Sequence, residues 1–389
     1  MTGRRPRILL GVTSDASIRL LDGFPEFLAT RGWDVHVVSS RGDLLDRLAS
    51  TKLVTTHPLE MAREPAPLSD IAALVRWIRL LRKVRPDVMS VGTPKAGLLG
   101  GVAGVLTRTP SRVYLLRGLR LETVFGAKRR VLKFLEKVAS ASAHKVLAVS
   151  DSLRAEFLKL EIASEDKVVV LGAGSSNGVD VGAFSPNRFT ESNLSALRSE
   201  LGLTPGVPVV GFVGRLNLDK GLDVLVDARR QVIAQGTNFQ LLIVGGIDSP
   251  NPEEDVAFLS EAGNLVCQTG HVEDPAIYYG LVDVLCLPTR REGFPNVVLE
   301  AAAMGIPTVT TSATGAVDSV VEGVTGLIVP VGSAHSLAEG LTKLIRDPER
   351  RKAMGEAARA RTVEFYSRNN VWDLYAEFYD DLITSAKGA

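Results

Sequence analysis

Short runs rich in β-branched residues alternate along almost the whole chain with stretches of 3.6-residue apolar spacing, and this alternation limits the possible fold most strongly. Strands that alternate with helices form a parallel sheet covered on both faces, because consecutive parallel strands need a crossover connection. In the first half we predict strands at residues 7–13, 34–40, 87–93, 112–117, 145–150 and 167–171. Helical spacing is clear at residues 71–84 and 129–139.

The same alternation restarts in the second half, after a turn-rich segment at residues 175–186. Predicted strands there are 208–213, 239–244, 264–269, 284–287, 308–311 and 326–329. A chain of 389 residues is long for one core and fits two domains. We therefore predict an α/β protein with two Rossmann-like, doubly wound domains, residues 1–180 and 186–369, facing a central cleft. An amphipathic helix at residues 370–389 is expected to pack back on the first domain.

The net charge of +1 hides an asymmetry between the two halves. Residues 1–180 hold 28 Lys and Arg against 18 Asp and Glu, a balance of +10, and the remainder carries −9. A basic half attracts phosphate-bearing substrates, anionic lipid or nucleic acid. Because nucleic-acid recognition motifs and aromatic platforms are missing from the sequence, we expect no nucleic-acid partner.

Targeting signals and cysteine spacing point to a cytoplasmic protein. The N-terminal apolar run is too short for a signal peptide, and the apolar segment at residues 97–106 falls short of the ~20 residues that a membrane-spanning helix needs. Cys267 and Cys286 have no disulfide or zinc spacing, and we interpret them as reduced, buried thiols. The protein could still lie on the inner face of the plasma membrane without crossing it.

Two cations follow the first strand of the second half. After residues 208–213 come Gly214 and Arg215, then Lys220, and a helix starts directly afterwards. Two cations and the positive end of a helix suit a diphosphate group. The alternative is a solvated Arg and Lys on an ordinary connecting loop.

Two carboxylates flank the start of another helix in the block REGFPNVVLEA. Glu292 precedes that helix, and Glu300 lies about one turn inside it, where it can accept the hydroxyls of a ribose. The segment between them is Gly293, Phe294, Pro295, Asn296 and Val297. Its residues other than Pro295, which has no N–H, can offer backbone N–H groups to a ligand held over the helix start. The alternative is an acidic residue that complements the helix dipole, plus an exposed helical Glu.

These blocks resemble a known family. The turn GRLNLDKG, the REGFPNVVLEA block, MGIPTVTT (304–311) and TGLIVP (325–330) resemble the retaining glycosyltransferases of family 4, which have the GT-B fold. In the first half, TPKAGLLG (93–100), RGLRLET (117–123) and GSSNGVD (174–180) resemble a bacterial branch that builds surface polysaccharides or other lipid-linked glycans.

The resemblance implies an activity and a role for each motif residue. Arg215 and Lys220 would bind the donor diphosphate, Glu292 the transferred sugar, and Glu300 the ribose. The implied reaction moves a hexose or N-acetylhexosamine from a nucleoside-diphosphate sugar to a glycan or polyprenyl-linked acceptor, with retention of configuration. UDP is the nucleotide that the resemblance favours.

Four further residues are candidates for ligand binding. Arg117 stands where many family members have His, and it cannot act as a titrating acid or base near neutral pH. It could clamp a phosphate of the acceptor or donor, or be a structural Arg at a strand end. Gly11 could admit a ligand to the backbone or simply make a tight turn. His271 and Val272 follow a predicted strand at the place where a nucleobase would sit.

We expect no metal site and no divalent-metal requirement. The sequence has no Asp-x-Asp triplet, and its five histidines lack the spacing of a helical zinc pair. Rival activities are a sugar-nucleotide epimerase of the same fold, a glycogen-phosphorylase-like enzyme, and transfer to a soluble small-molecule acceptor. A nicotinamide-dependent dehydrogenase is disfavoured, because no G-x-G-x-x-G follows the first strand.

Two basic amphipathic segments of the first half suggest peripheral contact with an anionic membrane. In residues 71–85 the expected apolar face is Leu74, Trp77, Ile78 and Leu81. In residues 128–137 five cations surround four apolar residues. Basic amphipathic helices can lie in the membrane interface. The alternative is that both helices pack on the sheet, which also requires an apolar stripe.

Overall fold

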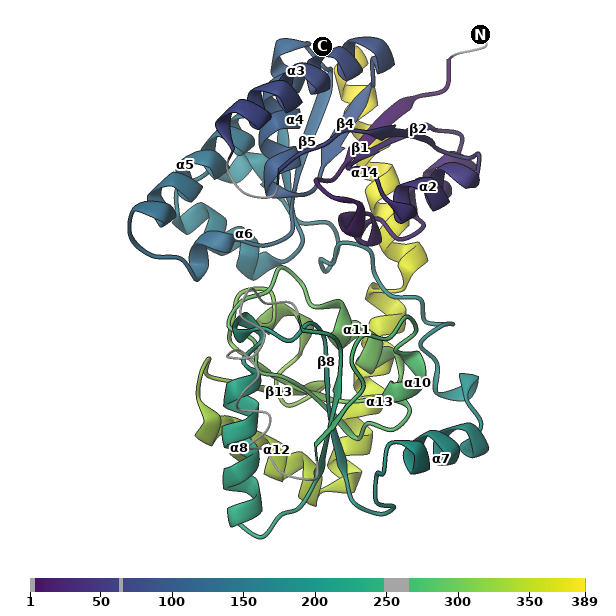
Figure 1. Cartoon of the computed structure of the whole chain (residues 1–389), viewed down its shortest axis with the longest axis vertical. Coiled ribbons are helices and arrows are strands. Elements are labelled where there is room, and N and C mark those ends of the chain that lie inside the picture. The colour runs from purple at the N-terminus through teal and green to yellow at the C-terminus, as the bar shows by residue number, and fades with distance from the viewer. Residues whose placement is uncertain (1–3, 63–65, 248–265, 389) are drawn as a thin grey trace. The chain divides into compact units, whose positions relative to one another are not determined.

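The computed structural model describes residues 4–62, 66–247 and 266–388, and the chain divides into two compact units (Figure 1). The first unit is Met1–Asn177 together with Asn369–Ala389, and the second is Gly178–Arg368. The division after Asn177 falls inside the turn-rich segment that was expected between the domains.

The first unit contains a seven-stranded parallel sheet with the order β3-β2-β1-β4-β5-β6-β7. Its strands are β1 (Arg7–Gly11), β2 (Asp34–Ser39), β3 (Thr55–Pro58), β4 (Val88–Val91), β5 (Ser111–Leu116), β6 (Lys145–Ala148) and β7 (Val168–Val169). Strand β3 was not predicted, because this edge strand carries Thr, His and Pro instead of an apolar run.

The sheet of the first unit is covered by helices on both faces. Its helices are α1 (Phe24–Thr30), α2 (Asp43–Ser50), α3 (Pro67–Val84), α4 (Pro94–Leu106), α5 (Gly126–Ser142) and α6 (Asp151–Lys159), with short 3-10 turns η1 (Asp15–Leu20), η2 (Arg120–Glu122) and η3 (Glu165–Lys167). Helices α3, α4 and α5 lie side by side (Figure 1). Trp77 of α3 is fully buried in one cluster with Leu9 and Val91 of the sheet. Among the described residues, no helix is long and apolar enough to span a bilayer.

The C-terminal helix α14 (Arg368–Gly388) belongs to the first unit from Asn369 onward. The hydroxyl of Tyr379 donates to Ser90 Oγ on β4 at 2.9 Å, and that of Tyr375 donates to the carbonyl of Ser175 at 3.1 Å. Both tyrosines are buried, and their rings contact Phe24 of α1. The helix therefore packs on the sheet as a structural part of the first unit.

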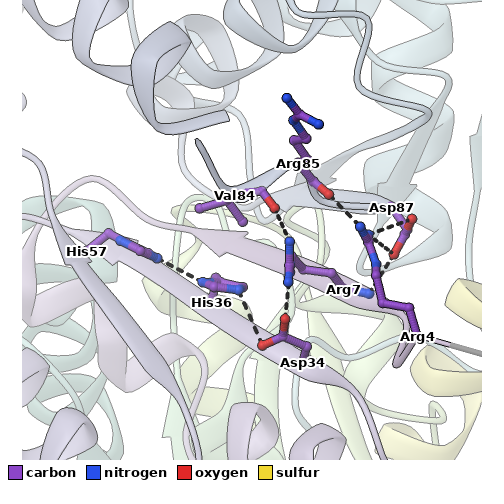
Figure 2. Close-up of polar contacts among 8 residues, drawn as sticks. All are labelled: Arg4, Arg7, Asp34, His36, His57, Val84, Arg85 and Asp87. Atoms are coloured by element: carbon purple, nitrogen blue, oxygen red, sulfur yellow. Dashed lines mark hydrogen bonds and ion pairs between the residues drawn. The ribbon is translucent and has the colours of Figure 1, made fainter. Parts of the chain in front are cut away.

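A polar network lies across the amino-terminal part of the same sheet (Figure 2). Arg7 on β1 donates from Nε to Asp34 Oδ2 at 2.6 Å and from its backbone N–H to Asp87 Oδ2 at 2.7 Å. On the neighbouring strands, His36 Nδ1 and His57 Nε2 are 2.9 Å apart. Burial lowers the pKa of both histidines, that of His57 to about 4.

The second unit contains a six-stranded parallel sheet with the order β10-β9-β8-β11-β12-β13. Its strands are β8 (Val209–Val213), β9 (Gln240–Val244), β10 (Val266–Gln268), β11 (Val284–Leu287), β12 (Thr308–Thr311) and β13 (Gly326–Val329). All six were predicted; residues 264 and 265 of the expected third strand lie outside the described residues.

Helices cover both faces of this second sheet as well. They are α7 (Glu191–Glu200), α8 (Leu222–Ala234), α10 (Ala276–Tyr279), α11 (Asn296–Ala303), α12 (Ala334–Arg346) and α13 (Pro348–Phe365), with 3-10 turns η4 (Pro186–Arg188), η5 (Leu218–Lys220) and η6 (Val317–Ser319). One core cluster joins α8 and α12 to the sheet, and the other joins α10 and α11 to its opposite face. Cys286 is fully buried and Cys267 partly so.

Both sheets share one topology. In each, the third, second and first strands of the unit lie on one side, and the fourth, fifth and sixth follow on the other. This is the Rossmann strand order, and it confirms the prediction of two doubly wound domains. The order also places a topological switch point between β1 and β4 in the first unit, and between β8 and β11 in the second.

Candidate active site

The carboxyl edge of the second sheet brings the two predicted donor motifs together. The chain leaves β8 toward β9 on one side and returns from β10 to β11 on the other. Ligands of doubly wound sheets bind at such a switch point, where the loops diverge. The Arg215 and Lys220 motif follows β8, and the Glu292 motif follows β11.

The turn after β8 is pressed against the turn after β9. A Cβ on Gly245 would lie 1.8 Å from the carbonyl oxygen of Gly214, so no other residue fits there without moving the backbone. The N–H of Leu216 donates to the carbonyl of Gly246 at 2.9 Å. These contacts fix the backbone on either side of Arg215, whose side chain is exposed at this edge.

Lys220 and Glu292 form an ion pair across the switch point. Lys220 Nζ donates to Glu292 Oε1 at 2.5 Å, and their side chains are 20% and 13% exposed. Gly221, at φ 67°, lets the two loops approach, because a Cβ there would lie 2.0 Å from the carbonyl oxygen of Pro288. The structure thus places a cation and a carboxylate 72 residues apart in sequence at one partly buried position.

Two further ion pairs, which the sequence motifs did not indicate, hold the same loops together. Arg290 makes a bidentate pair with Asp223 at 2.6 and 3.0 Å, and Arg291 contacts Asp219 at 2.6 Å. Hydrogen bonding to Asp223 raises the pKa of Arg290. The hydroxyl of Thr289 donates to the carbonyl of Asp219 at 3.1 Å. Together these contacts hold η5, which ends in Lys220, against the loop that carries Glu292.

The start of α11 is closely packed. The N–H of Glu292 donates to the carbonyl of Thr314 at 2.9 Å, and a Cβ on Gly315 would lie 2.2 Å from the carbonyl oxygen of Gly293. Phe294 and Pro295 are buried. Asn296 and Val297, the first helical residues, are half-buried. The helix start is therefore held between the loops after β11 and β12.

Glu300 lies in the second turn of α11, as the sequence indicated, with a partner that the sequence did not indicate. The hydroxyl of Tyr279 donates to Glu300 Oε2 at 2.7 Å. Tyr279 ends the short helix α10 and is 1% exposed. Burial and the nearby Glu300 carboxylate raise the pKa of this tyrosine well above its usual value.

His271 and Val272 follow β10 at the same edge of the sheet. His271 is exposed and lies beside Gly246 of the neighbouring turn, since a Cβ on that glycine would be 3.4 Å from His271 Cβ. Val272 is half-buried against the core that contains α10 and α11. Both residues therefore lie on the same sheet edge as Arg215, and their place beside a nucleobase stays a prediction.

The two candidate residues of the first unit, Arg117 and Gly11, face the interior of that unit. Arg117 follows β5, and its guanidinium donates from Nη2 to the carbonyl of Leu20 at 2.9 Å. Its Nε and Nη1 atoms are buried and have no hydrogen-bond partner among the described residues. Burial lowers the pKa of Arg117. Gly11 ends β1, where a Cβ would be 2.9 Å from both Trp77 and Val91, so close packing explains this glycine.

Comparisons with known proteins agree with the two-domain division. Residues 26–174 match the model of a glycosyl transferase 4-like domain, and residues 195–361 match that of glycosyl transferases group 1. A capsular polysaccharide biosynthesis glycosyltransferase of Staphylococcus aureus is 38% identical over 97% of this chain and 97% of its own length. A GDP-mannose-dependent phosphatidylinositol monomannoside mannosyltransferase of Corynebacterium glutamicum is 35% identical over 54% of this chain and 55% of its own.

Solved structures show the same fold. A glycosyltransferase from Rickettsia africae has a TM-score of 0.81 at 22% identity, covering 98% of this chain and 99% of its own. Anabaena HepE, solved in complex with UDP, has a TM-score of 0.79 at 20% identity, covering 97% of this chain and 100% of its own. The chain therefore belongs to the glycosyltransferases that combine a 4-like domain and a group 1 domain on the GT-B fold.

Proposed function

We propose that this glycosyltransferase moves a hexose or N-acetylhexosamine from a UDP-sugar to a glycan or polyprenyl-linked acceptor, with retention of configuration. The observation that carries the proposal is the meeting of Lys220 and Glu292 at the switch point of the second sheet, next to the start of α11. The staphylococcal relative's role in capsular polysaccharide biosynthesis and the UDP bound to HepE support the acceptor and donor classes.

The second unit would stabilise the leaving group. In the transfer, a bond forms between the acceptor oxygen and the anomeric carbon, and the bond from that carbon to the phosphate oxygen breaks. The electron pair leaves with the nucleoside diphosphate, whose phosphate oxygen takes the acceptor's proton. Lys220 and Arg215 oppose the negative charge that develops, and such preorganised stabilisation is usually the largest catalytic contribution. We propose that these cations suffice without a divalent metal.

Neighbouring residues would orient the rest of the donor. Glu292 contacts the transferred sugar, and Glu300 accepts the ribose hydroxyls. Backbone N–H groups between Gly293 and Val297 receive the diphosphate at the positive end of α11. His271 and Val272 border the base.

The first unit would bind the acceptor. The Nε and Nη1 atoms of Arg117 have no hydrogen-bond partner within the described part of the chain, and this supports an anionic group of the acceptor as their ligand, because a buried cation without partners is costly.

The test is acceptor-dependent release of nucleoside diphosphate. The purified protein is incubated with UDP- and GDP-sugars, with and without polyprenyl-diphosphate-linked saccharide, in excess EDTA. We expect UDP release only when donor and acceptor are both present. Turnover with GDP-sugars but not with UDP-sugars would overturn the UDP assignment. Conversion of the donor sugar in the absence of acceptor would indicate an epimerase. Loss of turnover in EDTA, restored by Mg²⁺ or Mn²⁺, would contradict metal independence.

We further propose that the α5 surface, defined as the exposed basic and apolar residues at 125–137, holds the protein on an anionic membrane where a polyprenyl-linked acceptor resides. Its apolar members Phe125, Val131 and Phe134 are 82%, 53% and 64% exposed. Its exposed cations are Lys128, Arg129, Arg130 and Lys137. Each basic residue near an anionic leaflet contributes about 1 kcal/mol, and the phenyl groups suit the interface.

Helix α3 does not provide the apolar face that the sequence suggested. Trp77 and Leu81 are 0% and 2% exposed, and Leu74 and Ile78 pack half-buried against the same core cluster. The indole N–H of Trp77 points to Met61 Sδ at 3.4 Å. The stripe serves packing on the sheet, so the proposed docking rests on α5.

Co-sedimentation with vesicles tests the docking. The wild type should pellet with phosphatidylglycerol vesicles at low salt, remain soluble with phosphatidylcholine, and be released by salt. Replacing Phe125 and Phe134 by Ser should abolish pelleting. Phe365→Ser is the matched control, because this phenylalanine is 47% exposed in the second unit. Equal pelleting of all three proteins would overturn the α5 assignment.

A further inference from the structure

The contact between Tyr279 and Glu300 links a buried aromatic residue to the carboxylate of the candidate donor site. The phenol donates to Glu300 Oε2 at 2.7 Å and also lies 3.3 Å from the carbonyl oxygen of Val297. Because the pKa of Tyr279 is raised, the phenol stays protonated near neutral pH and remains a donor. Hydrogen bonds to a charged acceptor are stronger than neutral ones.

The position of Tyr279 is itself fixed by several contacts. Phe184 meets its ring edge-on, with ring centroids 5.8 Å apart. Asp274, just before α10, accepts from the N–H of Ala276 at 3.0 Å, and Arg188 pairs with Asp274 at 2.6 Å. Because packing already fixes the ring of Tyr279, this side chain loses little further conformational entropy when its hydroxyl binds Glu300. Tyr279 therefore restricts the Glu300 carboxylate more than a mobile side chain would.

We propose that Tyr279 is a positioning residue that orients the Glu300 carboxylate toward the ribose hydroxyls of the donor nucleotide. This inference rests on the proposed function, because it needs a nucleotide at Glu300. A glutamate on a helix surface otherwise samples several rotamers. By holding Oε2, Tyr279 limits these rotamers to those in which the carboxylate faces the ligand in one orientation. In this proposal Tyr279 itself contacts neither the sugar nor the phosphates of the donor.

The first experiment measures UDP binding by calorimetry in full-length wild type and Tyr279→Phe. Losing one hydrogen bond to a charged group should weaken UDP binding roughly tenfold. Tyr278→Phe is the matched control, because Tyr278 lies next to Tyr279 on α10, is half-buried, and carries no role in the proposed site. We expect the control to bind UDP like the wild type. Replacing Tyr279 by 4-aminophenylalanine, which keeps a donor at the ring tip, should restore most of the affinity.

The second experiment separates ribose orientation from general support of the fold. Wild-type protein should bind UDP more tightly than 2′,3′-dideoxy-UDP, and the ratio of the two dissociation constants reports the ribose contact. In Tyr279→Phe this ratio should fall toward one, while affinity for the dideoxy compound changes little. Once bound donor saturates the enzyme, kcat should change less than KM for the donor.

The possible results distinguish a failure of the positioning role of Tyr279 from a failure of the proposed function. A wild type that binds neither UDP nor a UDP-sugar would overturn both. A wild type that prefers UDP over its dideoxy analogue, with an unchanged ratio in Tyr279→Phe, would overturn the positioning role alone. A variant that melts far lower and loses affinity equally for both compounds would assign Tyr279 to folding, and would also overturn it.

Discussion

The two units share a strand order but have different residues at the carboxyl edges of their sheets. In the second unit the switch point holds the Lys220–Glu292 pair. In the first unit the equivalent point between β1 and β4 holds close packing at Gly11 and a hydroxyl contact, with Thr13 Oγ1 2.6 Å from Thr93 Oγ1. The topology therefore sets where a ligand can bind, and the side chains decide whether that edge is built for a charged ligand or for packing.

The neighbouring cations show the same difference. Lys95 follows β4 in the first unit, but its ammonium is bound by both oxygens of Asp70 on α3 at 2.7 Å and is 9% exposed. Arg117 turns inward to the carbonyl of Leu20. Arg215, after β8 in the second unit, is exposed at the edge. From these environments we expect the diphosphate of the donor, as distinct from an anionic group of the acceptor, to bind at the edge of the second unit.

The largest effect should come from removing a cation at the second switch point. We expect Lys220→Ala and Arg215→Ala each to lower acceptor-dependent turnover ~10²–10³-fold, because losing one preorganised donor to a developing anion costs about that much. Steady-state rates with a saturating donor measure this. Lys343→Ala, an exposed lysine of α12, is the control and should keep its rate. Near-normal turnover in both site variants would remove the contrast between the two edges.

A smaller effect should separate the two carboxylates. Glu300→Ala should weaken UDP binding by roughly ten- to a hundredfold, the loss of charge-assisted hydrogen bonds. Glu292→Gln should slow transfer but bind UDP at least as tightly as wild type, because removing its charge leaves Lys220 to the diphosphate. Calorimetry with UDP and turnover assays measure the two effects. Weaker UDP binding in Glu292→Gln would show that the Lys220–Glu292 pair persists in the liganded site and supports the nucleotide.

Sequence reasoning worked where a local pattern carries the information. The strands were predicted from apolar runs, and β3 was missed because its short run of Thr, His and Pro at a sheet edge resembles a loop. The positions of Arg215, Lys220, Glu292 and Glu300 could be predicted because each motif is contiguous with a strand end or a helix start, whereas their binding roles stay a prediction.

Contacts between distant residues could not be predicted in the same way. The Arg290–Asp223 pair spans 67 residues and the Tyr279–Glu300 contact spans 21, and neither spacing has a periodic signature. The α3 stripe left two interpretations open, for a related reason. An apolar face on a helix has the same pattern whether a sheet or a membrane covers it, and only the burial of Trp77 decides between them.

The smallest expected effect concerns stability against pH, and it uses two buried groups of the first unit. Burial raises the pKa of Glu136 to about 7, although the hydroxyl of Tyr114, which donates to its Oε2 at 2.9 Å, partly opposes the shift. Burial lowers the pKa of His57 to about 4, with repulsion from His36 and Lys83 adding to it. The two groups therefore act on the free energy of unfolding in opposite directions.

For Glu136, the folded state binds the extra proton, so its contribution is fully present below pH 4.5 and is lost as the pH rises through 7. For His57, the unfolded state binds the extra proton, so stability is present above pH 6.5 and is lost as the pH falls toward 4. Between about pH 4.5 and 6.5 the two slopes, each at most about 1.4 kcal/mol per pH unit, largely cancel in the wild type.

Single substitutions should separate the contributions of Glu136 and His57 to the pH dependence of the free energy of unfolding. In Glu136→Gln the free energy of unfolding should rise with pH between 4 and 6.5, because the histidine contribution is then unopposed. In His57→Gln the free energy of unfolding should fall as the pH rises from 4.5 to 7. The fall should be smaller than Glu136 alone would cause, because the lowered pKa of His36 still acts in the opposite direction. Urea unfolding of the first unit, followed by the fluorescence of its tryptophans Trp33, Trp77 and Trp372, measures both slopes. Parallel pH profiles for wild type and both variants would mean that neither group keeps its shifted pKa in solution. The contrast between the units would then rest on the switch points alone.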